Sequence, residues 1–189
     1  MNDFLHDLVN NLSKSWSRVG ALFRALFLNR LRNVDVAFIR EQLNKQEQIL
    51  FYSMAAFDQR HSLDVAYTLR DLLGKRSKVR PDKLYKAALL HDIGKARTRL
   101  LVRDRVAQVL LFTLLPPLAN YLADRGSERT GYWRRILYFY KHHPKISAAL
   151  AKSVSADSET LYLIEQHHAP FTSGEPKELT LLREADELN

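Results

Sequence analysis

The sequence contains no cysteine among its 189 residues. Disulfides, thiolate nucleophiles and cysteine-ligated zinc are therefore excluded. Any divalent transition metal must be held by histidine and carboxylate side chains, a ligand set that suits Mn, Fe, Co, Ni or Zn. Glycine is scarce, with six residues, and runs of β-branched residues are few. A sheet protein is thus disfavoured.

No secretion signal or transmembrane helix is expected. Met1–Phe4 lacks the basic segment with which a signal peptide begins. The longest apolar run, Val106–Ala123, contains polar residues and is interrupted by Pro116 and Pro117. It predicts two buried helical pieces rather than a membrane span. A cytoplasmic location follows as the expectation.

Positive charge is in excess, with a formal net charge of +8. Between Arg70 and Arg105 there are twelve lysines and arginines and four aspartates, whereas Ser155–Asn189 has two basic and eight acidic residues. The basic stretch fits an anionic ligand near a metal site, or it is an ordinary solvated helix surface. No nucleic-acid recognition motif is present, so a phosphate ester or nucleotide is the expected partner.

Helical periodicity recurs throughout and predicts an all-α protein of seven or more helices. The expected helices cover residues 4–28, 34–57, 58–74, 81–94, 101–124, 132–142, 144–153, 158–168 and 177–188, with approximate ends. The first carries an apolar stripe that packs on the protein or lies on a membrane surface. Residues 1–57 are expected to pack on a domain formed by residues 58–189, giving one compact domain.

Six of the seven histidines occur in four places, near helix ends or on apolar helix faces. One inward histidine is usually an ordinary core residue with one hydrogen bond. An inward aspartate is costly unless a positive group meets it, and Asp92 and Asp186 both fall at inward positions. A shared metal site explains these residues together. A carboxylate can bridge two ions, and two ions about 4 Å apart activate a water for attack on phosphorus.

Five segments carry the histidines and aspartates in a fixed order: Asp58–Ala66, Ala87–Lys95, His143-Pro144 with Ser147, Ile164–His168, and Ala185-Asp186. In this order they resemble the HD superfamily of metal-dependent phosphohydrolases, and Ala87–Lys95 is similar to its HDIG signature. The resemblance spans about two thirds of the chain. It implies a helical bundle of the HD type that binds one or two divalent ions.

The resemblance also implies the roles of single residues. One ion would be held by His61, His91, Asp92 and Asp186, and a second by Asp92, His143, His167 and His168. His142 competes with His143, which is preferred because it directly precedes proline. Asp92 and Lys95 would be catalytic, with Lys95 reaching the scissile phosphate, although Lys95 also suits the role of a helix-dipole partner. Arg97 and Arg99 are expected to help bind the anionic substrate.

Two departures from the family pattern bear on which substrate the chain would cleave. The stretch between His91 and His143 is longer than the family needs, and residues 101–140 predict an inserted helical pair that acts as a lid, a dimer surface or a substrate-selecting cap. The residues after His168 differ from those of cyclic-di-GMP phosphodiesterases, and the Glu-Asp pair of guanosine tetraphosphate hydrolases is missing. The sequence is also compatible with a homodimer.

The expected function is hydrolysis of a phosphomonoester or phosphodiester, most simply of a nucleotide, by a metal-activated water. Phosphodiesterase and nucleotidase or phosphatase activities both remain open. A dinucleoside tetraphosphate hydrolase is disfavoured, because those enzymes usually have His-Thr where this chain has His167-His168. A catalytically silent regulatory or binding module is disfavoured because every ligand position is filled. A mixed-valent di-iron oxygenase is a third alternative.

Overall fold

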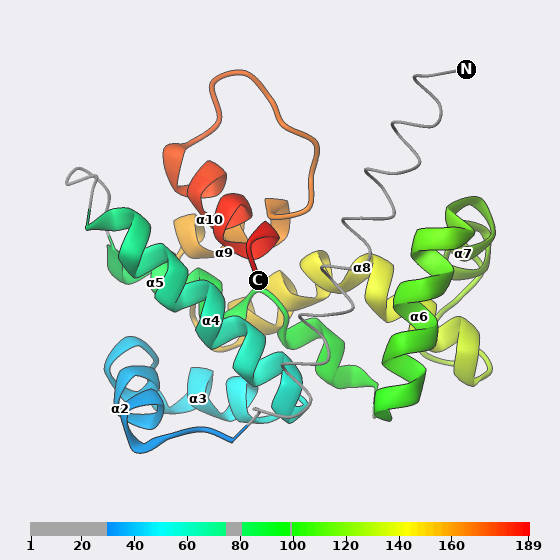
Figure 1. The fold of residues 1–189 in the computed structure, drawn as a ribbon, viewed down its shortest axis with the longest axis horizontal. Helices are drawn as coiled ribbons and strands as arrows, with labels where there is room; N and C mark the ends of the chain where they lie inside the picture. The colour runs from blue at the N-terminus through cyan, green and yellow to red at the C-terminus, as the bar shows by residue number, and fades with distance from the viewer. Residues whose placement is uncertain (1–29, 75–80, 99) are drawn as a thin grey trace.

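The computed structural model describes residues 30–74, 81–98 and 100–189 (Figure 1). Within these ranges the chain forms nine α-helices, one 3-10 helix and no strand, which confirms the predicted all-α class. The elements are α2 (Asn33–Gln42), α3 (Lys45–Tyr52), α4 (Ala56–Leu73), α5 (Pro81–Leu90), η1 (Ile93–Arg97), α6 (Val102–Leu114), α7 (Pro116–Asp124), α8 (Tyr132–Ser153), α9 (Ser158–Gln166) and α10 (Lys177–Glu187). The predicted helix over residues 4–28 lies outside the described residues.

The single helix predicted over residues 34–57 is wrong, because the chain forms α2 and α3 there. Asn44 begins α3, and its side chain accepts hydrogen bonds from the backbone N–H groups of Gln46 and Glu47, at 2.9 and 3.0 Å. The Glu47 carboxylate in turn accepts from the backbone N–H of Asn44 at 2.8 Å. This reciprocal capping satisfies donors that a helix start leaves free, and it stabilises a break between the two helices.

Helix α8 also differs from the prediction of two helices that meet at Pro144. It runs without interruption from Tyr132 to Ser153 with Pro144 inside it. Pro144 and Ser147 are buried, and α8 packs against η1 and α9 at this level. Proline usually disrupts a helix through one missing hydrogen bond and a steric conflict. Here the tertiary packing holds the helix together.

The main core lies between α4, α5, α9 and α10 (Figure 1). Fully buried leucines and isoleucines from each helix fill it, among them Leu63, Leu89, Ile164 and Leu182. Burial of such a side chain contributes roughly 1.5–3 kcal/mol. The core holds these four helices in fixed positions, so that polar residues at their ends meet in one place.

Helices α6 and α7 lie in the stretch that the sequence predicted as an insertion, and the chain bends by 115° between them at the two prolines. In the part of the chain that the structure describes, no single helix is long and apolar enough to cross a membrane, although α6 and α7 together have the length and composition of a bent span. The prediction that both pieces are buried is wrong in part. Leu110, Leu114 and Leu118 are 40%, 59% and 45% exposed.

One face of α6 is fixed to the body of the protein. The Arg105 guanidinium pairs with the Asp58 carboxylate of α4, and both side chains are buried. Arg105 also donates to the Gln108 side chain at 2.9 Å, and Gln108 donates to the carbonyl of Ile136 in α8 at 3.0 Å. A buried charge is tolerated when it is paired and hydrogen-bonded, so these contacts anchor α6 between α4 and α8.

Candidate metal centre

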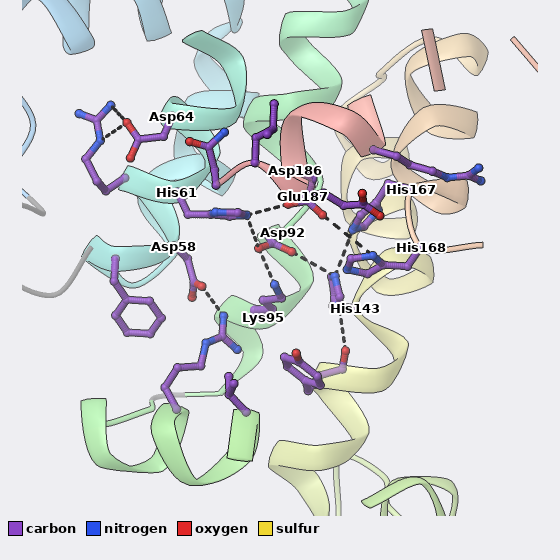
Figure 2. Close-up of a pocket in the computed structure, with 18 of the residues that line it drawn as sticks. Asp58, His61, Asp64, Asp92, Lys95, His143, His167, His168, Asp186 and Glu187 are labelled. Atoms are coloured by element: carbon purple, nitrogen blue, oxygen red, sulfur yellow. Dashed lines mark hydrogen bonds and ion pairs between the residues drawn. The ribbon is translucent and has the colours of Figure 1, made fainter. Parts of the chain in front are cut away.

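The predicted metal ligands lie together where α4, the turn after α5, α8, α9 and α10 meet. Figure 2 labels all of them except His91. Their side-chain nitrogen and oxygen atoms form three overlapping groups, in each of which the atoms lie within 4.8 Å of one another. The groups are His143 with His167 and His168, His61 with His91 and Asp92, and His91 with His167 and Asp186. All seven residues that the sequence predicted as metal ligands therefore belong to one cluster.

His91 and Asp92 lie in a turn rather than on a helix. The sequence predicted a helix that continues to Gly94, but α5 ends at Leu90 and η1 begins at Ile93. Both residues are buried, at 1% and 0% exposed. Neighbouring side chains on a helix would diverge by about 100°, whereas the turn lets both approach the same cluster.

Gly94 brings this turn close to α8. Its backbone N–H donates to the Ser147 hydroxyl at 2.8 Å. A Cβ atom at residue 94 would lie 2.7 Å from the backbone oxygen of His143, so only glycine allows this approach. As a result, Asp92 Oδ1 lies 3.1 Å from His143 Nε2.

Three of the histidines are oriented by a backbone carbonyl of the helix that contains or precedes them. In each ring, Nδ1 lies 2.6–2.7 Å from the carbonyl oxygen three residues earlier, which joins His91 to Ala88, His143 to Tyr140 and His167 to Ile164. The last four carbonyls of a helix have no intrahelical donor, and this frees those of Ala88 in α5 and Ile164 in α9. Since a carbonyl only accepts, Nδ1 carries the proton and Nε2 keeps a lone pair in the neutral ring.

The Nε2 lone pairs of His143 and His167 face each other, and that of His143 also faces a carboxylate. His143 Nε2 lies 3.2 Å from His167 Nε2 and 3.1 Å from Asp92 Oδ1. Asp92 Oδ1 is buried and has no hydrogen-bond donor among the residues that the structure describes. Three acceptor atoms at such distances repel one another unless a cation lies beside them. This group of nitrogen and oxygen atoms therefore fits the ligand set of a divalent metal ion.

Lowered pKa values favour the neutral form of two buried rings, those of His143 and His167, and a neutral imidazole is the form that binds a metal. Burial and the nearby Lys95 ammonium lower the pKa of His143 to about 3. Burial lowers the pKa of His167 as well, helped by the neighbouring histidines. Burial alone would lower the pKa of His91, but the Asp92 and Asp186 carboxylates raise it to about 9. The two carboxylates thus favour a proton on His91, which balances part of their charge.

Asp92 lies between two sets of nitrogen atoms (Figure 2). Its Oδ2 atom is 3.8 Å from His61 Nε2, 3.6 Å from His91 Nε2 and 2.5 Å from Lys95 Nζ. Its Oδ1 atom faces His143. Asp186 lies beside the first set, with Oδ1 3.0 Å from His61 Nε2. The two oxygens of Asp92 therefore have separate surroundings, as a bridging carboxylate requires.

The cluster lines a pocket of about 1140 Å³. Lys95 forms part of the pocket wall, whereas Arg97 is exposed and lies outside the wall. Arg99 lies outside the described residues. His142 lies beside Asp124, at 4.0 Å, and outside the three ligand groups. The pocket thus includes His143 and Lys95, but Arg97 does not reach it.

His168 is more open than its helical pattern predicted. Its side chain is 51% exposed, and its Nδ1 atom lies 4.0 Å from Asp186 Oδ2. The helix predicted to continue to residue 168 ends at Gln166, so the following residues leave the helical register. His167 takes the buried position instead, and His168 lies at the rim of the cluster.

Several pocket residues were missed by the sequence analysis. Arg105, Tyr140 and Arg183 line the wall. Arg183 donates to the carbonyl of Gln166 at 2.9 Å and pairs with Glu175, so it holds the end of α9 that carries His167. Of these three residues, only Arg105 left a signal in the sequence. It is a charged residue in the otherwise largely apolar helix α6, and such a residue is rarely buried without a partner.

The family model of the HD domain matches residues 59–111. The matched stretch contains His61, His91, Asp92 and Lys95, and it supports membership of the HD superfamily, as the motifs predicted. No curated protein and no solved structure matches the chain. The remaining ligand candidates lie beyond the matched stretch, and the geometry of the cluster is what joins them to it.

Proposed function

Because the chain carries an HD domain, we propose that it is a metal-dependent phosphohydrolase, which cleaves a phosphomonoester or phosphodiester with water as the nucleophile. A nucleotide is the favoured carrier of the phosphate, and the pocket of about 1140 Å³ exceeds the usual size of small-molecule sites. The observation that carries the proposal is the close approach of His143 Nε2 to both Asp92 Oδ1 and His167 Nε2, where Asp92 Oδ1 has no hydrogen-bond donor among the described residues.

The side chains suggest two adjacent ion positions that share Asp92. The first would be held by His61, His91, Asp92 and Asp186, and the second by Asp92, His143, His167 and His168. Nitrogen and carboxylate ligands of this kind suit Mn, Fe, Co, Ni or Zn. When bound, the metal would polarise a phosphoryl oxygen and lower the pKa of water.

Lys95 is the proposed contact to the scissile phosphate. Its side chain is 10% exposed, and its ammonium lies 2.5 Å from Asp92 Oδ2. Once a cation neutralises Asp92, this ammonium is free to donate to a phosphoryl oxygen and to stabilise the charge that develops there. Arg105 and Arg183 also line the pocket, but each is paired with a carboxylate. Arg97 would act only through its long-range field, which salt screens.

The test compares wild-type protein with Asp92→Ala, both purified without a metal-affinity tag. Mass spectrometry should find about two transition-metal ions per chain in the wild type, as a bridged pair requires, and a loss in the variant. Cleavage of aryl phosphomonoesters and phosphodiesters should disappear with the metal. Asp82→Ala is the matched control, since Asp82 is an exposed aspartate in the first turn of α5.

Different results would point to other functions. A fully loaded wild-type protein that cleaves no phosphate ester would contradict the enzyme proposal and leave a binding module. Redox-dependent oxygen consumption would indicate an oxygenase. Cleavage of dinucleoside tetraphosphates alone would narrow the substrate to that class.

A further inference from the structure

The turn between α6 and α7 presents an apolar surface to solvent. Its leucines and tyrosine are 40–59% exposed, and the two prolines between them are exposed as well. We define this surface as the α6–α7 tip, which consists of Leu110, Leu114, Leu115, Pro116, Pro117, Leu118 and Tyr121.

The tip is continuous across both helices. Leu110 and Leu114 are four residues apart on α6, and Leu118 and Tyr121 are three apart on α7, so each pair lies on one helix face. The sequence from Val106 to Ala123 contains no charged residue. In Figure 1, α6 and α7 stand at one side of the molecule, away from α2 and α3.

The tip cannot be buried by a simple rotation of α6. The opposite face of this helix is fixed by the buried pair of Arg105 with Asp58 and by the bond of Gln108 to α8. Further along α6, the Phe112 ring lies 4.7 Å from the Tyr140 ring. These contacts would have to break if α6 left the rest of the protein to enter a membrane as a span. The outer face of the pair therefore stays exposed.

An arginine borders the tip. The Arg125 guanidinium lies over the Tyr121 ring, 3.8 Å from its centre. The segment from residue 124 to residue 135, at and after the end of α7, contains four arginines and two acidic residues, Asp124 and Glu128. An apolar face edged by an aromatic ring and an arginine, next to a segment with a net positive charge, is typical of surfaces that rest at the interface of an anionic bilayer. A protein partner would not by itself require this positive border.

We propose that the α6–α7 tip docks on the surface of a bilayer that contains anionic phospholipids. The leucines enter the boundary between headgroups and acyl chains, while Tyr121 and Arg125 lie at the level of the phosphates. Val109 and Phe112, on the other side of α6, line the pocket. Docking would therefore hold the pocket wall about one helix diameter, roughly 10 Å, from the lipid.

Vesicle flotation with the full chain tests this proposal. Vesicles of equal parts phosphatidylcholine and phosphatidylglycerol are compared with vesicles of phosphatidylcholine alone. The double variant Leu114→Ser with Leu118→Ser should bind the mixed vesicles about tenfold more weakly or worse. The matched control is Val34→Ser with Ile49→Ser, on α2 and α3, since these side chains are 61% and 63% exposed. The control should bind as the wild type does.

The charge contribution is tested separately. Arg125→Glu should reduce binding to the mixed vesicles roughly fivefold or more, while binding to pure phosphatidylcholine changes little. Circular dichroism and metal content should match the wild type in every variant, which shows that the fold and the metal centre persist.

Three outcomes would overturn the proposal. Wild-type protein that floats with neither vesicle has no such docking surface. Unchanged binding by the double variant would place the lipid contact elsewhere in the chain. A wild-type dimer that the double variant converts to a monomer, without vesicle binding, would assign the tip to a second copy of the chain.

Discussion

The Nδ1 atom of His143 donates to the carbonyl oxygen of Tyr140 at 2.6 Å, and Pro144 is the reason that this carbonyl is free. In an α-helix the carbonyl of Tyr140 would accept from the backbone N–H of residue 144, which proline lacks. The imidazole supplies the missing donor. The His-Pro pair thus directs Nε2 of His143 toward Asp92 and His167.

Pro144→Ala should weaken metal binding without loss of fold stability. The new N–H would compete with His143 for the Tyr140 carbonyl, and loss of such a supporting bond typically costs 10–100-fold in metal affinity. The free energy of unfolding of the metal-free protein should stay the same or rise, because proline inside a helix costs roughly 3 kcal/mol relative to alanine. Metal titration and urea denaturation measure the two effects.

Pro117→Ala is the control for this change, since Pro117 lies at the start of α7, where proline costs little. It should leave the metal affinity unchanged. Wild-type metal affinity in Pro144→Ala would show that the bond to Tyr140 does not orient the ligand.

Gly94→Ala should damage both the fold and the metal centre. The added Cβ would lie 2.7 Å from the backbone oxygen of His143 and 3.0 Å from Ser147 Oγ. Forcing such atoms apart typically costs 1–3 kcal/mol, and it would move Asp92 away from His143. The midpoint temperature of thermal unfolding and the metal content should both decrease. Gly131→Ala, with open space around its Cβ position, should change neither. Normal metal content in Gly94→Ala would mean that the close approach is not needed.

The sequence was sufficient to predict the helical class, and the residues that it singled out as metal ligands lie together in one cluster of side chains. Histidine and aspartate are costly at inward positions, so their pattern stands out against apolar neighbours. The prolines at 116 and 117 correctly predicted the break between α6 and α7. Pro144, by contrast, does not break α8, because the His143 ring and the surrounding packing compensate for it.

Other features depend on contacts between distant segments and left no local pattern. The pairing of Asp58 with Arg105 joins residues on α4 and α6, and neither residue shows its partner in the sequence. The exposure of His168 follows from the end of α9 at Gln166, two residues earlier than predicted. The exposure of one face of α6 and α7 also depends on how these two helices pack against the rest of the protein. Periodicity describes one helix and not its neighbours.

The buried carboxylate of Asp35 should make folding sensitive to acid. Burial alone would raise the pKa of Asp35, but hydrogen bonds from Arg32 and Tyr67 lower it well below the usual value. A carboxylate with a lowered pKa in the folded state stabilises the fold above its unfolded pKa of about 3.9, and this stabilisation is lost as the pH falls below that value.

Asp35→Asn should therefore flatten the acid side of the stability profile. Urea denaturation in steps between about pH 6 and pH 3 should show a smaller decrease in the free energy of unfolding than in the wild type. The variant should also be less stable near neutral pH, because Arg60 loses a buried partner at 3.1 Å. Asp71→Asn, at an exposed position, should follow the wild type. Parallel profiles for wild type and Asp35→Asn would refute this role of Asp35.

The Arg105–Asp58 pair should stabilise the attachment of α6 only as long as both partners are present. Arg105→Met leaves a buried carboxylate without its cation, which typically costs 3–5 kcal/mol, while replacing both partners by apolar residues is often close to neutral. The double variant Arg105→Met with Asp58→Leu should therefore recover most of the loss in urea denaturation. Lys83→Met, which removes the ion pair to the more exposed Glu159, should cost less than about 1 kcal/mol. Metal content should be unchanged throughout, since neither partner belongs to the ligand groups. A double variant as unstable as Arg105→Met would mean that the bond of Arg105 to Gln108, rather than the charge pair, holds α6 in place.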